Sequence, residues 1–103
     1  MEKKKVIFVD DEHRILDGMR RMLRSMRDQW EITFVLGGKE ALERIQKEHF
    51  DVLISDMRMS GMDGAELLAR VKEYSPGTVR IILSGQAEKG AIMRTVGSAH
   101  QYL

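Results

Sequence analysis

The hydrophobic positions of this chain fall into two kinds of segment that alternate along the sequence. Short, mainly apolar runs rich in valine and isoleucine occur at residues 5–9, 30–36, 51–55 and 79–83 and predict strands, and the first is apolar at consecutive positions, which predicts burial on both faces. Between them, apolar residues recur at helical spacing. Strands that alternate with helices favour parallel pairing through right-handed crossovers, so the sequence predicts an α/β fold with helices on both faces of the sheet.

The first helical stretch, residues 12–27, has the clearest periodicity. Its apolar residues form one stripe, made by Ile15, Leu16, Met19, Met22, Leu23 and Met26. We expect these side chains, methionines included, to lie in the core rather than on an adaptable binding surface.

Turn and cap residues place the remaining elements. Gly37 and Gly38 break the chain before a second helix, and Asp63 is placed to cap a third helix. A weaker helix is predicted over residues 87–96, and residues 101–103 look like the beginning of a fifth strand.

Composition limits the function without identifying it. The chain has 103 residues, of which 43% are hydrophobic and 32% charged, and 17 basic against 16 acidic side chains give a net charge of +1. This is the size of one domain, with no overall field that would attract nucleic acid or an anionic membrane. Cysteine is absent, which excludes disulfides, thiolate metal sites and thiol nucleophiles. No apolar run is long enough to span a bilayer, so we expect a cytoplasmic domain without membrane partners.

Acidic residues collect where the predicted strands end. Asp10 and Asp11 follow the first strand, Asp56 follows the third and Ser84 follows the fourth. In parallel α/β sheets, ligands bind at the carboxyl ends of the strands. Carboxylates with a hydroxyl nearby suit Mg²⁺ better than zinc or copper, and an aspartate beside such an ion can attack a phosphoryl group. Singly, each residue is as well explained by a turn or a helix cap; jointly, they occupy the positions of one shared pocket.

Four segments carry a resemblance to a known family: residues 9–12, 51–56, 59–64 and 81–85. Over residues 4–103 the chain resembles the response regulator receiver domain of two-component signal transduction, the family of the chemotaxis protein CheY. The resemblance implies a flavodoxin-like, doubly wound parallel sheet with strand order 2-1-3-4-5. It also implies a signalling switch rather than an enzyme that turns over a small molecule.

The resemblance implies a role for each acidic residue. Asp56 would be the phosphoacceptor, receiving a phosphoryl group from a sensor histidine kinase or a phosphotransfer protein, and the domain would catalyse this phosphorylation and its reversal. Mg²⁺ would be held by Asp11, Asp56 and the backbone carbonyl of Arg58, with Asp10 acting through water. Phosphorylation would then change a surface that a partner reads.

Two further positions match the family, and two depart from it. Ser84 would hydrogen-bond the phosphoryl oxygen, and Tyr102 matches the aromatic position that rotates inward with it. Ser60 stands where the family usually has proline, which adds a backbone N–H and predicts a slightly looser turn. The family's phosphate-contacting lysine and final helix have no counterpart within residues 1–103.

We therefore expect residues 1–103 to be a C-terminally incomplete receiver domain, lacking the end of the fifth strand and the final helix. The strands are apolar on both sides, so this chain should expose an apolar patch beside its first helix. Either the chain is part of a longer regulator that supplies the missing pieces, or it self-associates to cover the patch.

Two other functions stay open at this point. One is a phosphorylation-independent interaction module that keeps the pocket but not the switch. The other is a Mg²⁺-dependent phosphohydrolase with Asp56 as nucleophile, which is disfavoured because Arg58 stands two residues later, where a general acid is needed. The output domain or effector is not identified, and nucleic acid would be reached only through such a domain.

A basic stripe lies on the first helix, at Arg20, Arg24 and Arg27, with Arg21 beside it. It is either an ordinary solvated face or a docking surface for a kinase or phosphotransfer protein. The histidines have no metal-ligand spacing and are interpreted as structural or surface residues: His13, His49 and His100.

Overall fold

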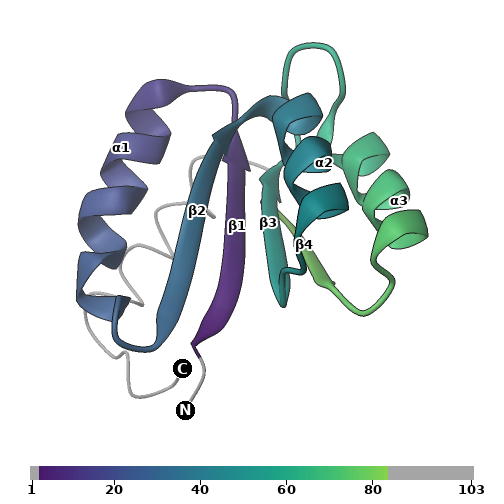
Figure 1. Ribbon diagram of the computed structural model, residues 1–103. Coiled ribbons are helices and arrows are strands. Elements are labelled where there is room, and N and C mark those ends of the chain that lie inside the picture. The colour runs from purple at the N-terminus through teal and green to yellow at the C-terminus, as the bar shows by residue number, and fades with distance from the viewer. Residues whose placement is uncertain (1–2, 84–103) are drawn as a thin grey trace.

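The computed structural model describes residues 3–83, which form a parallel four-stranded sheet with helices on both faces (Figure 1). In chain order the elements are β1 (Lys4–Asp10), α1 (His13–Met22), a 3₁₀ turn η1 (Leu23–Met26), β2 (Trp30–Leu36), α2 (Gly37–Lys47), β3 (Val52–Asp56), α3 (Gly64–Tyr74) and β4 (Val79–Leu83). The strand order is β2-β1-β3-β4, which confirms the predicted doubly wound arrangement for these four strands. The predicted helix at 87–96 and the strand from 101 lie outside the described residues.

The two sides of β1 face two different cores. α1 lies on one face of the sheet, and α2 and α3 lie on the other (Figure 1). Phe8 packs with Leu16 and Met19 of α1, whereas its neighbours Ile7 and Val9 pack against α2 and α3. Consecutive apolar residues are therefore buried on both faces, as the run at residues 5–9 predicts. No helix within residues 3–83 has the length and apolar character needed to cross a bilayer.

The first helix is shorter than its sequence pattern predicts. α1 ends at Met22, and one 3₁₀ turn continues the chain to Met26 instead of a single helix over residues 12–27. Met19 and Met26 are buried, but Met22 is 37% exposed, so its predicted place in the core is wrong. Met22 lies seven residues after the half-buried Ile15, which places both at the border of the apolar stripe rather than at its centre.

The remaining boundaries follow local signals in the sequence. Gly37 opens α2 with a φ of +83°, a conformation that glycine adopts without the usual steric cost. Asp63 caps α3 as predicted, since its Oδ1 accepts a hydrogen bond from the Glu66 N–H at 2.8 Å. The third strand is assigned one residue later than predicted, although Asp51 still hydrogen-bonds through its backbone to Lys5 and Val79.

Part of the sheet face beside α1 is exposed. Ile81 is in register with Ile54, which in turn is in register with Phe8 of the α1 core. Yet Val79 is 56% exposed and Ile81 is 39% exposed. The predicted exposure of apolar side chains on this face is therefore seen at β4.

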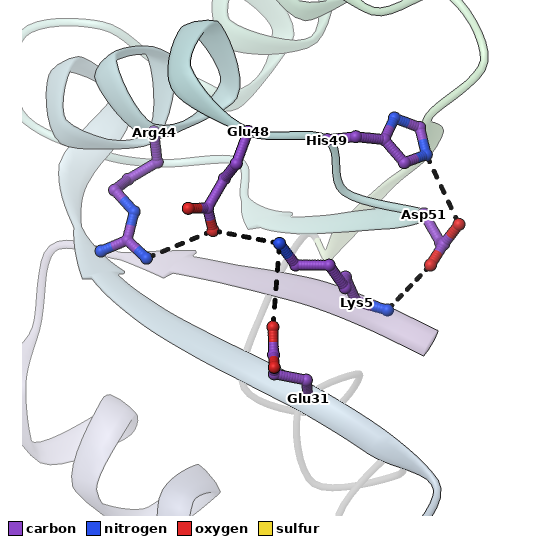
Figure 2. Close-up of polar contacts among 6 residues, drawn as sticks. All are labelled: Lys5, Glu31, Arg44, Glu48, His49 and Asp51. Carbon is purple, nitrogen blue, oxygen red and sulfur yellow. Dashed lines mark hydrogen bonds and ion pairs between the residues drawn. The ribbon is translucent and has the colours of Figure 1, made fainter. Parts of the chain in front are cut away.

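A polar cluster surrounds Lys5 at the opposite end of the sheet from the strand carboxyl ends (Figure 2). Its Nζ lies 3.4 Å from Glu48 and 3.7 Å from Glu31, and 5.2 Å from the centroid of the Phe50 ring. The Lys5 backbone N–H donates to Asp51 Oδ2 at 2.8 Å. This hydrogen bond lowers the pKa of Asp51, against an opposing effect of desolvation. Ionised Asp51 therefore stabilises the join between β1 and β3.

We predict that Asp51→Asn lowers stability at neutral pH more than at acidic pH. Because the pKa of Asp51 is lower in the folded state, its contribution is present above the unfolded-state value of about 3.9 and is lost as the pH falls through the folded-state value. Urea unfolding of the wild type and the variant at neutral pH and below pH 4 measures this, with the exposed Asp28→Asn as control. An equal loss of stability at both pH values would contradict the prediction.

Candidate functional site

Three aspartates meet at the carboxyl ends of β1 and β3. One carboxylate oxygen each of Asp10, Asp11 and Asp56 lies within 4.8 Å of the other two. Asp10 is fully buried and Asp56 is 7% exposed, while Asp11 is half-buried. The parallel register of β1 and β3, which pairs Val9 with Ser55, causes this meeting, because the next residue on each strand is then an aspartate. The prediction that these three aspartates lie close together is confirmed.

Backbone donors from the following loops orient two of these carboxylates. The Glu12 N–H donates to Asp10 Oδ1 at 3.0 Å. The Ser60 N–H donates to Asp11 Oδ2 at 2.9 Å and so joins the loop after β3 to the loop after β1. Proline at position 60 would lack this donor. The N–H that serine adds at this position is therefore used, because it holds Asp11, and the expectation of a looser turn stays a prediction.

The backbone that follows Asp56 is fixed from two sides. The Met57 N–H donates to the carbonyl of Leu83 at 3.0 Å, and the Met57 carbonyl accepts from the Gly64 N–H at 2.8 Å. A Cβ atom on Gly64 would lie 2.5 Å from the Asp56 carbonyl oxygen and 2.9 Å from the Met57 Cα. Only glycine allows α3 to begin this close to the end of β3. Gly64 lies in the motif segment 59–64, but nothing else in the sequence pattern indicates this close contact.

Of the other predicted site residues, the structure describes Arg58 but not Ser84 or Tyr102. Arg58 is exposed and lines, with Asp11, Met59 and Ser60, an open hollow of about 560 Å³ beside the aspartates. This position is compatible with the predicted role of its backbone carbonyl, which stays a prediction. Ser84 and Tyr102 lie outside the described residues, so their predicted roles do too.

The donor set fits a hard divalent cation. Carboxylate oxygens are the ligands that Mg²⁺ and Ca²⁺ prefer, and the described residues bring no histidine into the acidic group. Two of the carboxylates are buried, so a bound cation would relieve their mutual repulsion in a region poorly screened by water. The site can therefore hold a metal and present Asp56 beside it.

The described residues thus form a doubly wound parallel sheet with three aspartates at its carboxyl edge. Residues 6–103 match the family of the response regulator receiver domain, and the chain belongs to this family. It is thus a CheY-like receiver domain of two-component systems.

Known proteins of two kinds are similar to the chain. The chemotaxis protein CheY4 of Vibrio cholerae is 32% identical with a TM-score of 0.73, covering 93% of this chain and 82% of that one. The hydrogenase transcriptional regulatory protein HoxA of Cupriavidus necator is 34% identical over 100 residues, which are 95% of this chain and 20% of that protein. The uncharacterized transcriptional regulatory protein YesN of Bacillus subtilis is 38% identical over 82% of this chain and 23% of its own length. The chain therefore spans under a quarter of these two regulators.

We predict that Ser60→Pro weakens the binding of a divalent cation about fivefold, because it removes the hydrogen bond that orients Asp11. Ser60→Ala keeps the backbone N–H and is the matched control, expected to bind as the wild type. Calorimetric titration with Mg²⁺ measures both affinities. Equal weakening in the two variants would show that the serine side chain, rather than its N–H, matters.

We predict that Gly64→Ala lowers the free energy of unfolding by about 1–3 kcal/mol, because the added methyl group meets rigid backbone. Since that backbone is the peptide after Asp56, cation affinity should fall as well. Gly77→Ala is the control, because nothing lies within 4 Å of a Cβ at that glycine. Denaturant unfolding of all three proteins tests the effect, and wild-type stability of Gly64→Ala would disprove the close approach.

Proposed function

We propose that this chain is a phospho-accepting switch in which Asp56 receives a phosphoryl group in a Mg²⁺-dependent reaction. The observation that carries the proposal is the meeting of Asp10, Asp11 and Asp56 within 4.8 Å at the carboxyl edge of a receiver-domain sheet. Asp11, Asp56 and the Arg58 carbonyl would hold the ion, with Asp10 acting through water. Ser84 would contact the phosphoryl group, and Tyr102 would respond to it.

The reaction requires a nucleophile and a positive charge that neutralises the phosphoryl oxygens. A carboxylate oxygen of Asp56 attacks the phosphorus atom, a P–O bond forms, and the bond from phosphorus to the donor breaks with its electron pair leaving on the donor. Bound Mg²⁺ supplies neutralisation of the phosphoryl oxygens. Asp56 is held almost fully buried and fixed through the Met57 backbone, so its direction of attack is set before the donor arrives. Attack of water on the aspartyl phosphate would then restore the Asp56 carboxylate and release inorganic phosphate.

The phosphoryl donor is a sensor histidine kinase or a phosphotransfer protein, in a cytoplasmic setting. The relatives that carry the names of transcriptional regulatory proteins are several times longer than this chain, which suggests an output domain outside residues 1–103. Phosphorylation would shift a two-state equilibrium of the domain and so change the surface that the output domain or another partner contacts.

Treatment with Mg²⁺ and acetyl phosphate tests the proposal directly. We predict that the wild type gains the mass of one phosphoryl group and that Asp56→Asn does not, because the amide is a far weaker nucleophile than the carboxylate. Asp28→Asn, at an exposed position outside the site, is the matched control and should be modified as the wild type. Removal of Mg²⁺ with a chelator should abolish the modification.

The same experiment separates the other functions. Identical responses of the wild type and Asp56→Asn, with both still binding partners, would favour a phosphorylation-independent interaction module. Continuous release of phosphate from small phosphoesters would favour a hydrolase. Beryllofluoride, which imitates a phosphoryl group, should alter the conformation of the wild type only if the switch is coupled to the site.

A further inference from the structure

A groove runs between α1 and the edge strand β2, on a part of the domain that the proposed phosphoryl chemistry does not use. Its volume is about 470 Å³. One side is lined by Arg20 of α1, by Leu23 and Arg24 of η1 and by Arg27 after it, and the other side by the β2 residues Trp30, Ile32 and Phe34. We call this the α1–β2 groove. In the sheet of the described residues, β2 is the outermost strand on this side.

The arginines differ in how they are held. Arg20 forms an ion pair with Asp17 at 3.2 Å and lies with its Cζ 5.0 Å from the centroid of the Phe34 ring. It therefore closes one end of the groove with a fixed, partly neutralised guanidinium. Arg24 and Arg27 are exposed, and neither forms an ion pair with any residue in the described part of the chain.

The floor of the groove is apolar and only partly covered. Trp30, Ile32 and Phe34 are each half-buried and pack at the border of the α1 core. Aromatic and aliphatic side chains that flank unpaired guanidinium groups are typical of the centre of a binding interface rather than of an ordinary solvated helix face. The groove brings three arginines together although the net charge of the chain is only +1.

We propose that the α1–β2 groove binds an acidic peptide segment with an apolar anchor residue. Carboxylates of the segment would pair with Arg24 and Arg27, because planar guanidinium groups match carboxylates in geometry as well as in charge. The anchor side chain would cover Trp30 and Ile32. The bound segment belongs to a separate partner protein, and its acidic and apolar chemistry is what selects it.

This site is separate from the aspartates. Trp30 is in register with Lys4 at the start of β1, whereas Leu36 is in register with Asp10 at its end. Trp30 and Leu36 are six residues apart along β2, which corresponds to roughly 20 Å. The Trp30 end of the groove is therefore far from the aspartates, whereas Phe34 at the other end is in register with Phe8, two residues before Asp10.

The single tryptophan of the chain reports on this groove. A short peptide that alternates glutamate with leucine is titrated into the 103-residue chain while Trp30 emission is followed. We predict a saturable change that weakens as salt is added, because the contacts are charge pairs at the surface. In the double variant Arg24→Glu/Arg27→Glu, the affinity should fall about tenfold or more, since two exposed pairs are reversed.

Control variants make the result specific to the groove. Lys47→Glu/Lys72→Glu makes the same change of net charge on exposed positions of α2 and α3 and should bind as the wild type. Asp56→Asn should also bind as the wild type, which keeps this test independent of the proposed switch. Circular dichroism verifies that each variant is folded.

Three outcomes would overturn the proposal: no saturable change of Trp30 emission, equal affinity of the two double variants, or tighter binding of the analogous peptide with serine in place of leucine. Tighter binding of a single-stranded oligonucleotide than of the peptide would also overturn the proposal, because the preferred ligand of the groove would then be a nucleic acid.

Discussion

The repulsion among three neighbouring carboxylates is the constraint on which the rest of this domain depends. Asp10, Asp11 and Asp56 lie within 4.8 Å of one another, and two of them are buried. Carboxylates held this close repel one another when ionised, and water screens that repulsion poorly where the side chains are buried. A marginally stable small domain can keep such an arrangement only if other interactions fix the backbone that carries it. Every element that ends at this edge contributes to that fixing.

The fixing is done mainly by backbone groups. The N–H groups of Glu12 and Ser60 each donate to one of the carboxylates, and Met57 is hydrogen-bonded to Leu83 on one side and Gly64 on the other. Backbone donors carry no counter-charge, so they orient the carboxylates without neutralising them. This is the physical link between the doubly wound fold and the proposed phosphoryl transfer.

The sequence predicted the parts of the structure that depend on periodicity and strand order. The apolar runs located all four described strands, and the acidic residues that end two of them were expected to meet because parallel strands share one carboxyl edge. The contacts that depend on distances across the fold were not predictable. The Ser60 to Asp11 hydrogen bond joins residues 49 positions apart. The close approach of α3 to the Asp56 backbone, which requires glycine at position 64, exists only once α3 has packed against the end of β3. The end of α1 at Met22 and the 3₁₀ turn that follows were likewise not predictable from the periodicity, which continues to Met26.

The two ends of the sheet have different tasks, and β1 connects them. At its carboxyl end β1 carries the buried Asp10, whereas near its start Lys5 contributes to an ion-paired cluster with Glu31 and Glu48 that needs no ligand. The residues between them, from Val6 to Val9, are buried in close-packed cores on both faces. β1 thereby joins the acidic site at one end of the sheet to the ion-paired cluster at the other through a continuous buried strand.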